Sequence, residues 1–66
     1  MKLIINGKVI EVPNALSVAD LVVHLGLGDG PVAVEVNRAI VTRAKHTTHQ
    51  LAEGDVIELV RFVGGG

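Results

Sequence analysis

The first twelve residues, MKLIINGKVIEV (1–12), decide the fold of this chain. The central pair Asn6-Gly7 is the strongest short signal for a β-hairpin, because both residues tolerate the positive φ that a type I′ turn requires. A loop of two residues also sets the register, so Ile4 is expected to face Val9 on the second strand. The chain is therefore predicted to begin with two antiparallel strands.

Alternation along these strands predicts one face toward a core and one toward solvent. The side chains predicted on the core face are those of Leu3, Ile5, Ile10 and Val12. Ile4 and Val9 point the other way, together with charged residues of the hairpin. They are the first indication of an exposed apolar surface.

A single amphipathic helix is predicted over 17–25. Ser17 is a suitable N-cap, and Asp20 three residues later completes the pattern of a capping box. The apolar stripe at helical spacing consists of Val18, Leu21, Val22 and Leu25. Gly26 follows as the expected left-handed cap, so the helix ends there.

The second half of the chain predicts more strands. Residues 32–36 alternate and are rich in β-branched side chains, while 39–41 is a short edge strand after a turn. The polar segment 42–51 contains at most one helical turn. The last strand is predicted over 56–63, with Ile57 and Leu59 directed inward and Glu58, Val60 and Phe62 on the opposite face.

This order of elements predicts one α+β domain over residues 1–66, with one helix across one face of a mixed sheet of four to five strands. That arrangement is the β-grasp fold. The other face of the sheet has no cover, so Val60 and Phe62 are expected to join Ile4 and Val9 there. Because a contiguous exposed apolar patch is typical of an interaction site, these four residues are candidate docking residues.

The composition argues against several classes of function. The 66 residues carry six basic and seven acidic side chains, one Phe, and no Trp, Tyr or Cys. Without a basic stripe or stacking aromatics, no nucleic-acid partner is expected. No apolar run is long enough to cross a bilayer, and the N-terminus lacks the regions of a signal peptide. The protein is therefore expected to have no membrane partner and to be cytoplasmic.

No catalytic constellation is recognisable. Ser17 is explained by helix capping, and the acidic residues are dispersed. His46 and His49 are three apart, with His24 as a third candidate metal ligand. Because neither a Cys nor a carboxylate lies within 42–50, solvated histidines explain them better and no metal is expected. The chain is predicted not to be an enzyme and to bind no cofactor.

The sequence closes on Gly64, Gly65 and Gly66. Because glycine has no Cβ, residues 63–66 are predicted to form a flexible tail that can thread into a narrow slot, reaching roughly 13–14 Å when extended. A frayed terminus is the alternative interpretation. The Gly66 carboxylate is the candidate reactive group.

Several segments together resemble the ThiS family, the small ubiquitin-like sulfur carriers of bacterial thiamine biosynthesis. They are MKLIINGK (1–8), VEVN (34–37), Ile40-Val41 followed by Arg43, LAEGDVIELV (51–60) and FVGGG (62–66). The resemblance covers essentially the whole chain, and it departs from the commonest pattern at HTTH (46–49), where relatives often carry an aromatic residue.

The resemblance implies a protein that serves as a substrate of other enzymes. A ThiF-type adenylating enzyme would consume ATP to convert the Gly66 carboxylate into an acyl-adenylate. A cysteine desulfurase persulfide would then supply sulfur for a thiocarboxylate, which thiazole synthase, ThiG, would use. Gly65 would be required beside the reacting carbonyl, and Gly64 would provide reach into a water-poor site.

Other interpretations remain open at this stage. The same ending would suit the small subunit of molybdopterin synthase or a sulfur carrier for tRNA thiolation. A β-grasp interaction module without tail chemistry is the third alternative. Extension of Gly66 by one residue separates these classes, because it would leave a binding module working and stop a sulfur carrier.

Overall fold

The computed structural model describes residues 1–27 and 31–62. Its elements follow in the order β1 (Lys2–Ile5), β2 (Lys8–Glu11), α1 (Val18–His24), β3 (Val32–Val36), β4 (Ala39–Val41), the 3-10 helix η1 (Arg43–Lys45) and β5 (Val56–Arg61). The last strand ends at Arg61 and is therefore shorter than the predicted span 56–63. The predicted tail, 63–66, lies outside the described residues.

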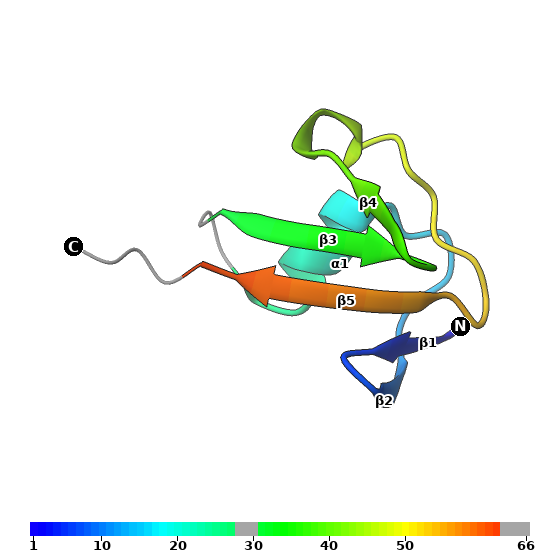
Figure 1. The fold of residues 1–66 in the computed structure, drawn as a ribbon. Helices are drawn as coiled ribbons and strands as arrows, with labels where there is room; N and C mark the ends of the chain where they lie inside the picture. The colour runs from blue at the N-terminus through cyan, green and yellow to red at the C-terminus, as the bar shows by residue number, and fades with distance from the viewer. Residues whose placement is uncertain (28–30, 63–66) are drawn as a thin grey trace.

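The five strands form one mixed sheet in the order β2-β1-β5-β3-β4. Strands β1 and β5 are parallel, and all other neighbours are antiparallel. In Figure 1, α1 lies behind β3 and β5, across one face of the sheet. The last strand in the sequence is thus the central strand of the sheet. This is the predicted α+β, β-grasp arrangement, with five strands.

Two tight turns build the sheet from local sequence. Asn6 and Gly7 have φ values of 49° and 82°, and the hairpin pairs Ile4 with Val9 in the predicted register. The turn between β3 and β4 has the same form, with φ values of 51° at Asn37 and 71° at Arg38. Positive φ at both central residues is the mark of a type I′ turn, whose twist matches that of the strands it joins.

The helix begins and ends where the capping residues predict. The Ser17 Oγ accepts from the Asp20 N–H at 3.1 Å, and the Asp20 carboxylate accepts from the Ser17 N–H at 3.0 Å, which closes the capping box. At the other end, Gly26 has a φ of 71° and donates to the Val23 carbonyl, while Leu27 donates to that of Val22. These two bonds form a Schellman motif, so carbonyls at the helix end keep partners.

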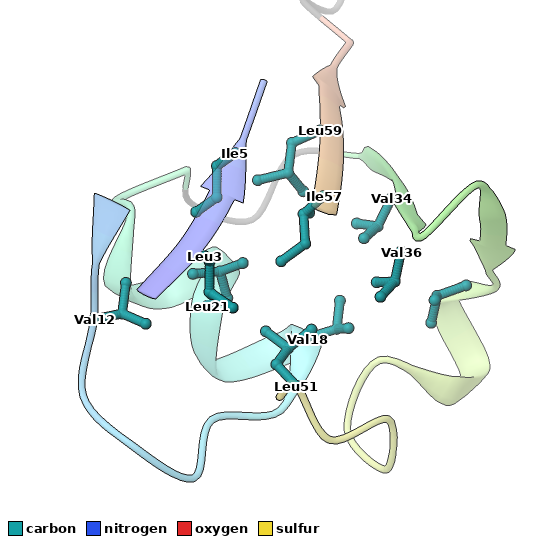
Figure 2. Packing of buried hydrophobic residues seen from close by; sticks show 11 residues of the cluster. Leu3, Ile5, Val12, Val18, Leu21, Val34, Val36, Leu51, Ile57 and Leu59 are labelled. Carbon is teal, nitrogen blue, oxygen red and sulfur yellow. The ribbon is translucent and has the colours of Figure 1, made fainter. Parts of the chain in front are cut away.

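The core lies between α1 and one face of the sheet (Figure 2). Its buried members are Leu3, Ile5, Val12, Val18, Leu21, Val34, Val36, Val41, Leu51, Ile57 and Leu59. All are aliphatic, as the near absence of aromatic residues requires. Each fully buried side chain of this kind stabilises the fold by about 1.5–3 kcal/mol relative to an exposed one. The inward direction predicted for Ile57 and Leu59 is confirmed.

The polar segment between β4 and β5 accepts hydrogen bonds from the first N–H groups of α1. The carbonyls of His49 and His46 accept from the N–H groups of Val18 and Ala19 at 3.0 and 2.8 Å. Leu51 is buried and donates its N–H to the Leu16 carbonyl at 2.9 Å, which ties the segment to the core. The single helical turn predicted here is η1. A segment without an apolar pattern therefore has a structural role that depends on its backbone.

Candidate functional site

The sheet face opposite α1 carries most of the exposed apolar side chains. Alternation along the strands directs to this face Lys2, Ile4, Val9, Glu11, Ala33, Glu35, Ile40, Val56, Glu58 and Val60. Phe62 follows in the same alternation after β5. Ile40 is 76% exposed, and Val60 and Phe62 are each 55% exposed. We call this surface the open face.

The four predicted docking residues all lie on the open face, but they do not form one patch. Ile4 pairs with Val9 on β2 and with Val56 on β5. Val60 lies four residues beyond Val56, about 13 Å along the strand, and pairs with Ala33. The apolar surface is therefore divided into a hairpin group (Ile4, Val9, Val56) and a terminal group (Ala33, Val60, Phe62). That these four residues bind a partner stays a prediction, and they lie in two groups because the pairing of β1 with β5 stops at Ile57.

Two glutamates separate these apolar groups. Glu35 on β3 and Glu58 on β5 are register partners, directly across from each other. Both are exposed, and Ile40 is the partner of Glu35 on the other side, on β4. The sequence directed Glu58 outward and predicted an alternating strand over 32–36, but it did not pair Glu35 with Glu58. Alternation along a strand predicts the sheet face on which a side chain lies, but it does not predict which residue lies beside it on the next strand.

The end of β5 is anchored on both sides. The Leu59 N–H donates to Asn6 Oδ1 at 2.9 Å, and Asn6 Nδ2 donates to the Leu59 carbonyl at 3.2 Å. The Phe62 N–H donates to the Pro31 carbonyl at 3.1 Å. Phe62 is therefore held by its backbone while its side chain is free to contact a partner. The candidate residues Gly64, Gly65 and Gly66 lie outside the described residues.

On the side of the sheet that carries α1, an open pocket of about 590 Å³ lies next to the end of the helix. It is lined by Ile5, Asn6, Lys8, Ile10, Leu25, Leu27, Leu59 and Arg61. Arg61 shares the inward alternation of Ile57 and Leu59 but is exposed, because the strand here extends past the core. This pocket could not be predicted from the sequence, since its walls come from four separate elements.

In the described part of the chain, His46 and His49 make hydrogen bonds that stabilise the fold. His46 and His49 support the helix N-terminus through their carbonyls, and the His46 ring Nε2 lies 3.0 Å from the Val41 carbonyl oxygen. Within residues 1–27 and 31–62, no group of three or more His, Cys, Asp or Glu is arranged to hold a metal ion. That the protein takes no metal stays a prediction. Among the described helices, none has the length and apolar character needed to span a membrane.

Comparison with known proteins agrees with the fold. The ThiS family model matches residues 3–66. The sulfur carrier protein ThiS of Bacillus subtilis is 35% identical over 63 residues, which are 94% of this chain and 96% of that protein. A crystal structure of the thiamine biosynthesis protein ThiS from Geobacter metallireducens superposes with a TM-score of 0.84 at 32% identity, covering all of both chains.

A third relative is much longer than this chain. A thiazole synthase of Paramagnetospirillum magneticum is 38% identical over 66 residues, which are 100% of this chain and 20% of that protein. The chain therefore spans about a fifth of the length of that relative.

Fold and site together define a class, the small ubiquitin-like β-grasp proteins with one covered and one open sheet face. Within this class, the match over residues 3–66 decides the family. The chain belongs to the ThiS family.

Proposed function

We propose that this chain is a sulfur carrier of thiamine biosynthesis whose reactive group is the carboxylate of Gly66. The observation that carries the proposal is the family match, which extends through residue 66, together with a similarity to a named sulfur carrier protein over 94% of this chain. The chain acts as a protein co-substrate, and the enzymes that modify it supply the catalytic groups.

The chemistry follows from the poor reactivity of a carboxylate. A carboxylate is a weak acyl donor, because its leaving group would be oxide. A ThiF-type enzyme therefore transfers AMP from ATP to the Gly66 carboxylate and releases pyrophosphate. The persulfide of a cysteine desulfurase then attacks the acyl carbon and releases AMP, which leaves an acyl disulfide. A thiol of the modifying enzymes cleaves the S–S bond, releases the Gly66 thiocarboxylate and is itself oxidised to a disulfide. ATP is consumed by the enzyme and is not a cofactor of this chain.

The final glycines suit this reaction sterically. The acyl-adenylate must form in an enclosed site, because water would otherwise hydrolyse it. Gly65 beside the reacting carbonyl and Gly64 behind it present no side chain to the walls of such a site. The open face binds the partner through Val60 and Phe62, which are nearest to the glycines in the sequence, and through Ile4 and Val9, while the glycines enter the enclosed site.

The sulfur acceptor in this proposal is thiazole synthase, ThiG. Support comes from the similarity to thiazole synthase sequences, in which a segment resembling this whole chain occupies 20% of the protein. A protein that carries both segments would keep donor and acceptor together. Transfer to a molybdopterin or tRNA pathway is the competing proposal, because the tail chemistry would be the same. The predicted cytoplasmic location stays a prediction.

Intact mass spectrometry tests the proposal directly. The chain is incubated with ATP, a ThiF-type enzyme and a cysteine desulfurase with cysteine. We expect the mass change for one carboxyl oxygen replaced by sulfur, and fragmentation should localise it to Gly66. A chain that has one added residue after Gly66 is the matched control, and it should stay unmodified. Addition of ThiG and its other substrates should then consume the thiocarboxylate.

The decisive negative result is also clear. If an enzyme preparation that modifies the Bacillus subtilis sulfur carrier leaves this chain without adenylate or thiocarboxylate, the proposal is wrong. If the thiocarboxylate forms but ThiG does not consume it, the carrier chemistry holds and the assignment to thiazole formation fails.

A further inference from the structure

The pairing of Glu35 with Glu58 is unfavourable for the isolated fold. The two residues are direct partners on neighbouring antiparallel strands, and both are exposed on the open face. Like charges directly across a ladder destabilise a sheet. The stability of the sheet therefore does not explain why two glutamates occupy these positions.

Among the described residues, no position directly across from either glutamate, or two residues along the same strand, is basic; Arg38, in the turn before β4, is diagonal to Glu35 in the register. The neighbours along the two strands and on β4 are Ala33, Asn37, Ile40, Val56 and Val60. The Asn37 amide is itself engaged, since it donates to Asp55 Oδ1 at 3.0 Å and accepts from the Val56 N–H at 3.0 Å. Beyond the end of β1, the Asn6 amide is bound to the Leu59 backbone. In the described ladder the two carboxylates therefore face outward with only each other and apolar or amide side chains directly across or two residues along.

Exposed apolar side chains surround this pair. Ile40 is on one side, and Val56 and Val60 precede and follow Glu58 along β5. These apolar side chains would exclude water from a contact made over the pair. Because charges interact more strongly where the dielectric is low, a cation held there would be attracted more than at an ordinary surface site.

We propose that the open face docks a protein surface that places a Lys or Arg side chain between Glu35 and Glu58 while apolar side chains pack against Ile40 and Val60. An arginine suits the site best, because its planar guanidinium can bind two carboxylates at once. The occupant is the adenylating enzyme, so this inference rests on the proposed function. It adds the chemical character of the enzyme's docking surface.

Charge complementarity also decides against other occupants. A second copy of the chain, related by a two-fold axis through the open face, would bring two acidic pairs toward each other. A nucleic acid would present phosphates to the same carboxylates. Both arrangements are repulsive, whereas a basic protein surface is attracted.

Calorimetric titration of the full chain into a ThiF-type adenylating enzyme tests the inference. The variants are E35Q, E58Q and the double variant, which keep the shape of the side chains and remove the charges. We expect the double variant to bind at least about tenfold more weakly than the unmodified chain, because a charge-assisted contact is lost. We also expect its binding to depend less steeply on salt concentration.

The matched control is E53Q, at an exposed glutamate outside the open face whose Oε1 accepts from the Lys2 N–H at 3.0 Å. It removes one charge away from the docking surface, and a glutamine Oε1 can still accept from this N–H, so the affinity should equal that of the unmodified chain. Thermal melting should show that the double variant is as stable as the unmodified chain or more stable, because repulsion is removed. Weaker binding then cannot come from misfolding.

Three outcomes would overturn the inference, and they differ from one another. If the enzyme adenylates the unmodified chain and binds the double variant with the same affinity as the unmodified chain, only this inference fails. If the enzyme neither binds nor adenylates the unmodified chain, the proposed function fails and this inference fails with it. If sedimentation shows a dimer of the unmodified chain that the double variant loses, the face binds a second copy and not a basic partner.

Discussion

Asp20 shows how one side chain connects sequence, local structure and pH. Its carboxylate accepts from the Ser17 N–H at 3.0 Å within the capping box. This backbone hydrogen bond, followed by the interaction with the Ser17 side chain, lowers the pKa of Asp20 below its ordinary value, and burial opposes the change only weakly. Hydrogen bonds to the charged form favour ionisation, so the capping box holds its acid as a carboxylate.

A stability measurement against pH follows from this lowered pKa. In the unfolded chain Asp20 titrates near pH 4, and in the folded protein it titrates at a lower pH. Its contribution is therefore fully present above about pH 4 and is lost as the pH falls through the folded pKa. We expect Asp20→Asn to be less stable than the unmodified chain at pH 7, with a difference that shrinks as the pH falls below about 4. Because Asp20 is exposed, the difference at pH 7 should be small.

Thermal melting of both proteins between pH 7 and pH 2 measures this difference. An NMR titration of the Asp20 carboxyl in the unmodified chain provides an independent value of its pKa. A difference in stability that stays constant over the whole range would contradict the role given to the ionised carboxylate.

At the scale of elements, the two type I′ turns differ in their second residue. The hairpin turn has Gly7 at this position, whereas the turn between β3 and β4 has Arg38, at a φ of 71°. A residue with a Cβ is strained in the left-handed region, and glycine is not. The second turn therefore forms despite an unfavourable residue, because β3 is already paired with the central strand β5.

We expect Arg38→Gly to stabilise the protein by about 0.5–1 kcal/mol, because the relief of strain exceeds the entropic cost of glycine. In a domain of this size, that gain raises Tm by a few degrees, about 4–8 °C per kcal/mol. Ala39→Gly is the matched control, one residue further on at an exposed strand position. It should destabilise the fold by about 0.5–1 kcal/mol. Equal effects of the two changes on Tm would refute this account of the turn.

At the scale of the whole molecule, the open face and the covered face have separate roles. The covered face holds the core, and the open face presents apolar side chains next to the anchored end of β5. Phe62 is the largest of these side chains and the nearest in sequence to Gly64. Aromatic anchors dominate the binding energy of many interfaces.

Phe62→Ala should therefore weaken binding of the adenylating enzyme by about 2 kcal/mol, or about thirtyfold, as expected for an interface hot spot. Its stability should change by less than about 0.5 kcal/mol, because the side chain is exposed. Val23→Ala is the control, since Val23 is 77% exposed on α1, away from the open face. Calorimetric titration and thermal melting of both variants check the two expectations. Equal affinity of both variants would remove Phe62 from the interface.

Features that depend on neighbours along the chain can be derived from the sequence alone. The hairpin register follows from Asn6-Gly7, the limits of α1 from Ser17 and Gly26, and the inward or outward direction of each strand residue from alternation. The family resemblance also came from the sequence, because its segments span nearly the whole chain. These features are local or compositional, so no knowledge of long-range contacts was needed.

The identity of neighbouring strands depends instead on long-range packing. The parallel pairing of β1 with β5 and the register of β3 on β5 join residues far apart in the sequence, and side-chain packing in the core selects them. These pairings divide the apolar open face into two groups and place Glu35 against Glu58. Alternation specifies a face for each side chain, but the neighbour across a ladder depends on the packing of the whole sheet.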